Sequence, residues 1–263
     1  MAPLLFEGVD VNRFLQGYIT CDVETLRADH WQPAALCNLQ GRVVAFGWAR
    51  RRAEEQILWL VHACLVDTLR TFLRPYLAFS KTRVDRFPSE VLVMGMLGTG
   101  IPGPAQIGRP GAAAGITLVE TEEILLQLAG SGHRVSEEDW MCALIEARIP
   151  WFTGAIGGRF LPQMLGITEL GGVDFEKGCY LGQEVVARAQ HLGRVKRALA
   201  ALHWSGTRAP EPGGDVRDQQ GREVGTLIQT TADPQGPRLC LAVLQEKATP
   251  PFQEQDTGLS PIP

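Results

Sequence analysis

Residues 177–184 read Lys-Gly-Cys-Tyr-Leu-Gly-Gln-Glu, and helix-forming residues continue from position 183 to 190. The pattern predicts a tight turn that leads into a helix, because glycine at positions 178 and 182 permits backbone conformations closed to other residues. Cys179 would then lie near a helix N-terminus and beside Lys177, and both influences favour the thiolate. The alternative is that Cys179 is a small buried apolar side chain, as free cysteines usually are.

Two neighbouring side chains also have purely structural explanations. Glu184 falls in the first turn of the expected helix, where an acidic residue interacts favourably with the helix dipole. Tyr180 is explained equally well as a core residue. The residues alone therefore leave a reactive turn and an ordinary packed turn both open.

The composition predicts a folded protein of more than one compact unit. The chain has 263 residues, of which 45% are hydrophobic and 21% charged, so a largely disordered chain is excluded. Its formal net charge is -4 and its pI is about 5.8, which argues against nucleic-acid binding through bulk electrostatics. A local basic strip remains compatible with these totals.

The six cysteines are scattered and contain no C-x-x-C pair, so neither a zinc site nor a disulfide framework is expected. The first residues lack the basic and apolar regions of a signal peptide. No apolar run approaches the ~20 residues that span a bilayer. We therefore expect a cytoplasmic protein that does not cross a membrane.

Hydrophobic periodicity predicts α+β order with antiparallel pairing, in units at 1–80 and 81–192. In the first unit we expect a helix at 11–17, a hairpin of 34–39 and 42–48 around Gln40-Gly41, a strand at 57–62, and a helix from 65 that Pro75 interrupts. In the second unit we expect strands at 82–87, 91–96, 117–119 and 124–128, a surface loop at 98–115, and a helix opened by Ser136 and Asp139 as a capping box. Gly98-Thr99-Gly100 resembles part of a dinucleotide fingerprint, but the prolines that follow argue against it.

The C-terminal region changes pattern. Strand-like runs at 195–204, 223–229 and 239–244 are joined by loops rich in Gly, Pro and Asp, which predicts a small β-barrel over 193–248. Residues 249–263 contain four prolines and no periodicity, so we expect this tail to be unordered.

The stretch at 177–184 also resembles the hallmark of the YgfZ proteins, which are relatives of the glycine-cleavage T-protein. The hallmark is Lys-Gly-Cys-Tyr-x-Gly-Gln-Glu. Further similarities to the family lie at Phe14-Leu15-Gln16-Gly17, Thr20-Cys21-Asp22-Val23, residues 36–42, 160–164, 170–173, 186–188 and 193–197. The resemblance thus covers about residues 5 to 245.

This resemblance implies two α/β units and a C-terminal β-barrel packed around a central cavity that binds tetrahydrofolate. It also implies an accessory role in iron–sulfur cluster assembly or repair, and thereby in tRNA modification, with Cys179 as the essential thiol. In the T-protein, an acidic pair that takes part in aminomethyl transfer follows the turn equivalent to Gln40-Gly41. Here Ala45-Phe46 occupies that place. Apolar side chains cannot exchange the proton that amine release requires, so aminomethyltransferase activity is not expected.

The predicted site follows from these considerations. Cys179, Lys177 and Glu184 are the candidates for chemistry. Candidates for folate binding are Asn38, Gln163, Tyr180 and Gln183 around the pterin, with Arg188, Arg194, Lys196 and Arg197 as charges for the glutamate tail. The basic run at 188–197 is equally compatible with a solvated face.

Three functions stay open at this stage. The first is the folate-binding accessory protein, whose partners would be iron–sulfur proteins or their assembly machinery. The second is a folate-dependent one-carbon transferase that uses Cys179 as its nucleophile. The third is a protein that binds tRNA directly, which the acidic total disfavours. We expect a monomer with no metal.

Overall fold

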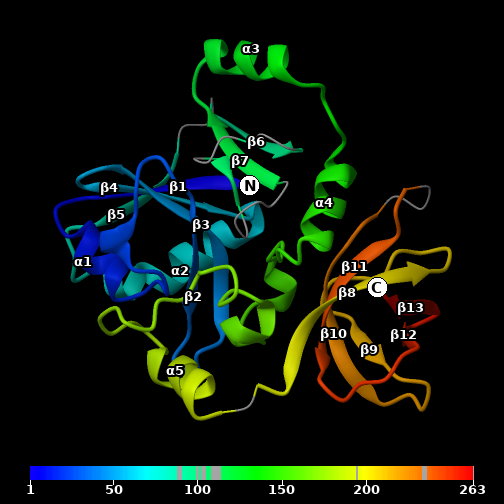
Figure 1. The fold of residues 1–263 in the computed structure, drawn as a ribbon. Coiled ribbons are helices and arrows are strands. Elements are labelled where there is room, and N and C mark those ends of the chain that lie inside the picture. Colours follow the sequence, from blue (N-terminus) through cyan, green and yellow to red (C-terminus); the bar gives the residue numbers. More distant parts are fainter. Residues whose placement is uncertain are drawn as a thin grey trace.

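The computed structural model describes residues 1–87, 91–98, 101, 105–107, 114–193, 195–232 and 236–262. Figure 1 shows three parts, which are an antiparallel sheet formed by the start of the chain, a two-stranded sheet with two helices, and a closed barrel at the C-terminal end. The predicted combination of mixed α and β structure with a C-terminal barrel is confirmed.

The first sheet has the strand order β2-β3-β4-β1-β5. Its strands are β1 (Ala2–Glu7), β2 (Gln32–Cys37), β3 (Val43–Ala53), β4 (Gln56–Val61) and β5 (Arg83–Arg86). The predicted hairpin joins β2 and β3, and Gly41 adopts a φ of 68° in its turn, a value that favours glycine. Because β5 pairs with β1, this sheet extends beyond the boundary expected at residue 80.

The helices of this part are α1 (Val11–Gln16), α2 (Val66–Leu77) and the short turns η1 (Val23–Thr25) and η2 (Ala63–Leu65). The expected interruption of the second helix at Pro75 is wrong, because α2 continues through this residue. Proline removes one N–H donor, and here the loss falls in the last turn, where the helix ends two residues later.

The second part contains β6 (Leu92–Leu97), β7 (Ala114–Val119), α3 (Glu122–Ser131) and α4 (Glu137–Glu146). The strand expected at 124–128 is wrong, since these residues belong to α3. The Thr121 side chain caps α3 by accepting a hydrogen bond from the backbone of Ile124. The capping box of Ser136 and Asp139 is confirmed at the start of α4. Most of the loop expected at 98–115, including Thr99 and Gly100, lies outside the described residues.

A long connection leads from α4 to the barrel through η4 (Gly154–Ile156), η5 (Pro162–Leu165) and α5 (Gln183–His191). The barrel strands are β8 (Arg197–Ser205), β9 (Asp215–Arg217), β10 (Glu223–Thr230), β11 (Leu239–Gln245), β12 (Phe252–Glu254) and β13 (Thr257–Pro261). They close in the order β10-β11-β8-β13-β12-β9. In Figure 1, α4 lies between the two-stranded sheet and the barrel.

The tail expected to be unordered is part of the barrel. β13 pairs with β8, and β12 pairs with both β13 and β9, so the last strands close the ring. The side chains of Phe252 and Leu259 are buried inside it. In β12 and β13 buried and exposed residues alternate over only a few positions and lie next to prolines, so the sequence alone does not predict strands there.

The barrel joins the rest of the core through β11, which is buried on both faces. Leu239, Leu241 and Val243 pack into the core that also contains the first sheet and α4, whereas Cys240 and Ala242 point into the barrel. Successive side chains of a strand face opposite sides, so the unbroken apolar run of β11 fits a strand between two cores.

The contribution of the C-terminal strands can be measured with two leucines. Leu259→Ala should lower the free energy of unfolding by about 2–4 kcal/mol, because it leaves a cavity in the barrel. Leu192→Ala, at a side chain that is 85% exposed, should change it by less than about 0.5 kcal/mol. Urea denaturation measures both. Equal effects of the two substitutions would mean that the end of the chain is not part of the folded barrel.

Candidate functional site

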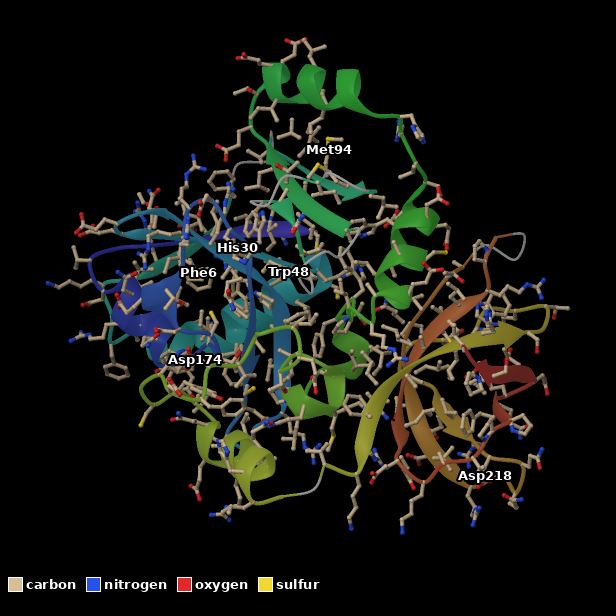
Figure 2. All side chains as sticks on the ribbon, viewed as in Figure 1. Phe6, His30, Trp48, Met94, Asp174 and Asp218 are labelled. Atoms are coloured by element: carbon tan, nitrogen blue, oxygen red, sulfur yellow. The ribbon has the colours of Figure 1, made fainter. Side chains whose placement is uncertain are left out.

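Residues 177–184, called the motif loop below, lie against the N-terminal part of the protein. The preceding segment bonds to the carbonyl of Thr20 through the backbone N–H of Asp174. In the loop itself, the N–H of Leu181 donates to the carbonyl of Gly17 at the end of α1, and the loop ends where α5 begins. Figure 2 shows Asp174 in this region, between the first sheet and α5. The motif loop is therefore positioned by contacts with residues more than a hundred positions earlier in the chain.

Thr20 and Asp174 fasten the segment that precedes the loop. The Thr20 hydroxyl donates to the carbonyl of Gly172 and accepts from the backbone N–H of Ala35 at 3.0 Å, so it connects this segment to β2. The Asp174 carboxylate accepts from the backbone N–H groups of Glu176 and Lys177 at 2.8 and 2.9 Å. Neither residue was among the predicted site residues, although a threonine that is fully buried must find partners of this kind.

Lys177 is a buried cation with a structural role. Its Nζ atom donates to the backbone carbonyls of Ile19 and Cys21 at 2.8 and 2.7 Å, and it lies 5.3 Å from the centroid of the Tyr180 ring. Burial lowers the pKa of this amine to about 8, against the attraction of Cys21, Asp22 and Asp174. The expectation that Lys177 activates Cys179 is not supported, because its ammonium is held by these carbonyls.

Tyr180 and Gln163 each bury a polar atom that has no partner among the described residues. The Tyr180 side chain is 6% exposed and its hydroxyl makes no hydrogen bond, while burial raises the pKa of this phenol. Gln163 donates from Nε2 to the carbonyl of Val186 at 2.9 Å, but its Oε1 is unpaired. An unpaired buried group is costly, so each of these side chains keeps one hydrogen-bonding atom unused.

The start of α5 is locked against the β2–β3 turn. Gly182 has a φ of 81°, and a Cβ atom at this position would collide with the carbonyl oxygen of Asn38. A Cβ atom on Gly41 would lie 3.0 Å from the Cβ of Val185. Two glycines thus allow the turn and the loop to touch through their backbones.

Asn38 and Gln183, two of the residues predicted to bind the pterin, make hydrogen bonds within this turn and at the start of α5. The Asn38 side-chain oxygen accepts from the backbone N–H groups of Gln40 and Arg42, both at 3.0 Å, so it is occupied by the hairpin. Gln183 is half-buried and donates its backbone N–H to the Tyr180 carbonyl at 3.1 Å.

Cys179 is exposed at the surface of the motif loop, and its Sγ atom has no hydrogen-bond partner in the part of the chain that the structure describes. Of its two interpretations, the buried apolar side chain is therefore wrong. Glu184 pairs with Arg188 at 2.8 Å on the exposed face of α5. Arg194 lies outside the described residues, whereas Lys196 is exposed and Arg197 is half-buried.

Ala45 and Phe46 lie on β3 and are 0% and 2% exposed. Phe46 packs on Trp48 with ring centroids 5.3 Å apart, and Figure 2 labels Trp48 near the centre of the molecule. The apolar pair is therefore part of the core and offers no group for proton transfer.

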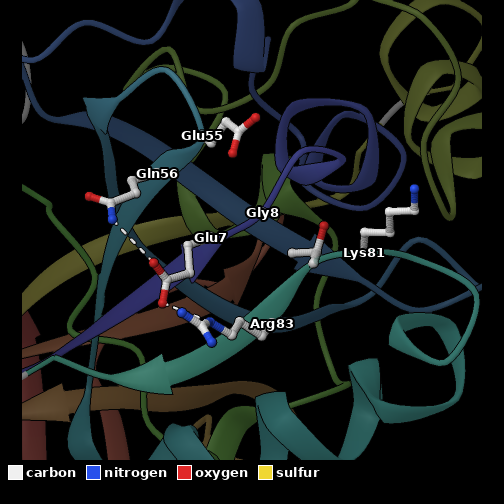
Figure 3. A pocket seen from close by; sticks show the side chains of 7 residues that line it. Glu7, Gly8, Glu55, Gln56, Lys81 and Arg83 are labelled. Carbon is white, nitrogen blue, oxygen red and sulfur yellow. Dashed lines mark hydrogen bonds and ion pairs between the residues drawn. The ribbon is translucent and has the colours of Figure 1, made fainter.

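Two cavities among the described residues lie away from the motif loop. The first, of about 400 Å³, is at the edge of the first sheet (Figure 3), where Glu7 binds Arg83 at 2.8 Å and accepts from Gln56 at 3.1 Å. The second lies on α2, beside Asp67 and Phe72. Neither is lined by a predicted site residue, so the expected central cavity is not among them.

Within the described residues, no three side chains of His, Cys, Asp or Glu are grouped as a metal site would require. No helix in the same residues has the length and apolar character needed to cross a membrane.

Comparison with known proteins identifies the fold. No protein-family model matches the sequence. The structure is similar to that of the glycine cleavage system aminomethyltransferase T from Bartonella henselae, with a TM-score of 0.71 and 13% sequence identity. The match covers 100% of this chain and 82% of that chain. The chain therefore has the fold of aminomethyltransferase T along its whole length.

The role of the buried cation is testable with Lys177→Met. The substitution leaves two carbonyls without their donor, and we expect it to lower the free energy of unfolding by about 3 kcal/mol near neutral pH. Lys247→Met, at an exposed lysine, is the matched control and should have little effect.

The same pair of variants reports the titration of Lys177. Its pKa is lower in the folded protein than in the unfolded chain, so above pH ~8 the unfolded chain holds a proton that the folded protein has lost. The stability of the wild type relative to Lys177→Met should therefore rise between pH ~8 and ~10.5. A difference that stays constant over this range in urea denaturation would contradict the burial of this amine.

Proposed function

We propose that this protein binds tetrahydrofolate and serves as an accessory factor in iron–sulfur cluster assembly or repair, with Cys179 as its functional thiol. The observation that carries the proposal is the aminomethyltransferase T fold along the full length of the chain, combined with a YgfZ-like motif loop built into that fold. The T-protein resemblance implies the folate, and the YgfZ resemblance implies the accessory role.

The residues around the motif loop fit a pterin in their hydrogen-bonding chemistry. A pterin presents both donors and acceptors at the edge of a flat ring, and Tyr180 and Gln163 supply one unpaired donor and one unpaired acceptor. We propose that these two side chains contact the ring. Asn38 is omitted from this set, because its side-chain oxygen is taken up by the hairpin turn.

The charged tail of folate requires cations near the site. Arg188 is exposed, and its guanidinium pairs with Glu184 through one nitrogen. Arg188 and Arg194 are the cations that we propose for the charged tail of folate. We propose that Gln183 lies at the edge of the folate site.

Aminomethyl transfer is not part of the proposed function. Ala45 and Phe46 are buried and apolar where the T-protein resemblance places the acidic pair, so no carboxylate from this pair can move the proton of the amine. Cys179, by contrast, is exposed on a loop whose backbone is fixed by glycine contacts and by Lys177. A fixed, accessible thiol is suited to an exchange with a partner protein.

Two variants test the folate contact. Tyr180→Phe should weaken tetrahydrofolate binding about 5- to 10-fold, the loss expected for one neutral hydrogen bond. It should leave the free energy of unfolding of the ligand-free protein unchanged or raise it by up to about 1 kcal/mol, because it removes an unpaired buried hydroxyl. Tyr76→Phe on α2 is the control for both measurements.

Anaerobic calorimetric titration under reducing conditions separates the outcomes. Wild-type affinity in Tyr180→Phe would remove this hydroxyl from the pocket. Absence of saturable binding in the wild type would refute the folate proposal as a whole.

The functional thiol is tested in a strain that lacks the chromosomal copy of this protein. Cys179→Ala should fail to restore the activity of iron–sulfur enzymes, whereas Leu192→Ala should restore it as the wild type does. Immunoblots must show equal amounts of both variants. Full complementation by Cys179→Ala would show that the thiol has no part in the function.

A further inference from the structure

A second exposed thiol lies outside the motif loop. Cys64 belongs to η2, immediately before α2, and its Sγ atom is 2.9 Å from Nδ1 of His62, the residue that follows β4 and caps η2. Cys64 is exposed and His62 is half-buried. A nucleophile and a base within hydrogen-bond reach are the arrangement by which proteins activate a thiol.

The hydrogen bonds determine which atom carries the proton. The backbone N–H of Cys64 donates to Nδ1 of His62 at 3.3 Å, so Nδ1 is the nitrogen with the lone pair and Nε2 carries the hydrogen. Because Nδ1 is an acceptor, the thiol must be the donor in the contact between the two side chains. The S–H bond of Cys64 therefore points at a base.

The surroundings of His62 favour the neutral imidazole, which is the form that can accept a proton. Burial and the amino group of Met1 lower the pKa of His62, while Glu137 on α4 opposes them. The ring also lies edge-on to Trp151, with centroids 6.0 Å apart, which fixes its orientation. A separate donor, the backbone N–H of Gly154, is 3.4 Å from Sγ and stabilises negative charge on it.

We propose that Cys64 is a redox-modification site, activated by His62, that forms a mixed disulfide with low-molecular-weight disulfides of the glutathione type. Cys64 is exposed, so the co-reactant reaches the thiol from solvent. This site is independent of folate and of Cys179.

The reaction balances as a thiol–disulfide exchange. The Cys64 proton moves to Nδ1 of His62, and the thiolate attacks one sulfur of the disulfide RSSR. A bond forms between Cys64 Sγ and that sulfur while the S–S bond of RSSR breaks. The second sulfur leaves as RS⁻ and takes the proton from the imidazolium, so Cys64 is oxidised and one RSH is released.

Oxidation would have a structural consequence. In the mixed disulfide, Cys64 no longer donates its S–H to His62, and the added group crowds the N–H of Gly154. These two contacts hold the segment that contains Trp151. The backbone N–H of Trp151 donates to the Gln229 side chain on β10, so this segment also connects the first sheet to the barrel. The modification therefore acts at a junction between parts of the fold.

The test compares proteins that each retain one exposed cysteine of this pair. Cys179→Ser keeps Cys64, Cys64→Ser keeps Cys179, and the four buried cysteines are common to both. Each is treated with excess oxidised glutathione, and intact-mass spectrometry follows the mixed disulfide with time. Near pH ~7 we expect Cys64 to react about 10-fold faster than Cys179, because Cys64 has a base within hydrogen-bond reach and Cys179 has no hydrogen-bond partner among the described residues.

The base is tested by adding His62→Asn to the Cys179→Ser protein. The asparagine oxygen can still accept from the Cys64 backbone N–H as a helix-capping residue, but it cannot take the thiol proton. We expect an about 10-fold slower reaction near pH ~7 and a rate that rises steeply with pH, as for an ordinary thiol. Circular dichroism and thermal unfolding check that the variant is folded.

Two results would overturn the proposal. One is a Cys64 rate no greater than that of Cys179, and the other is an unchanged rate and pH profile in folded His62→Asn. Either result would mean that the close contact of Cys64 and His62 belongs to the structure of the turn and does not activate the thiol.

Discussion

The buried ammonium of Lys177 joins two stretches of chain that are far apart in the sequence. Its bonds to the carbonyls of Ile19 and Cys21 span 158 and 156 residues. A carbonyl that follows a short helix lacks a regular partner, and a buried one must find it elsewhere. The motif loop supplies this partner, and its own position is fixed in return. The loop is thus a structural element as well as a candidate site.

The surrounding contacts depend on the same docking. Once the loop lies on the end of α1, Gly182 and Gly41 can touch, and α5 begins over the β2–β3 turn. Only then does Cys179 reach the surface while Tyr180 points inward. The alternation of exposed thiol and buried phenol follows from the backbone path, which requires glycine at position 182.

Part of the structure was predictable from interactions between residues that are close in the sequence. The hairpin at Gln40-Gly41 and the capping box at Ser136 depend on neighbours within four residues, and both were identified from the sequence. The run at 124–128 is apolar and short, which suits a strand as well as a helix, and the cap at Thr121 decided in favour of the helix. The strands of the tail became visible only through their pairing with β8 and β9.

Several contacts of the predicted site residues could not be predicted from the sequence. Lys177 was expected to activate a thiol, yet its partners are backbone carbonyls that no local pattern reveals. Thr20 and Asp174 were missed for the same reason. The contact between His62 and Cys64 was also not predicted, because two side chains at this spacing meet only if the backbone turns between them, and the sequence does not show this turn.

The closing strand β13 has a consequence for the order of assembly during synthesis. All strands of the first sheet lie within the first 86 residues, so the sheet can form while most of the chain is still to be made. β8, however, must wait for residues near the C-terminus before its second edge is covered. Until then the nascent barrel exposes an unpaired strand edge, which is a template for aggregation. Chaperone dependence should therefore concentrate in the interval between translation of β8 and emergence of β13 from the ribosome.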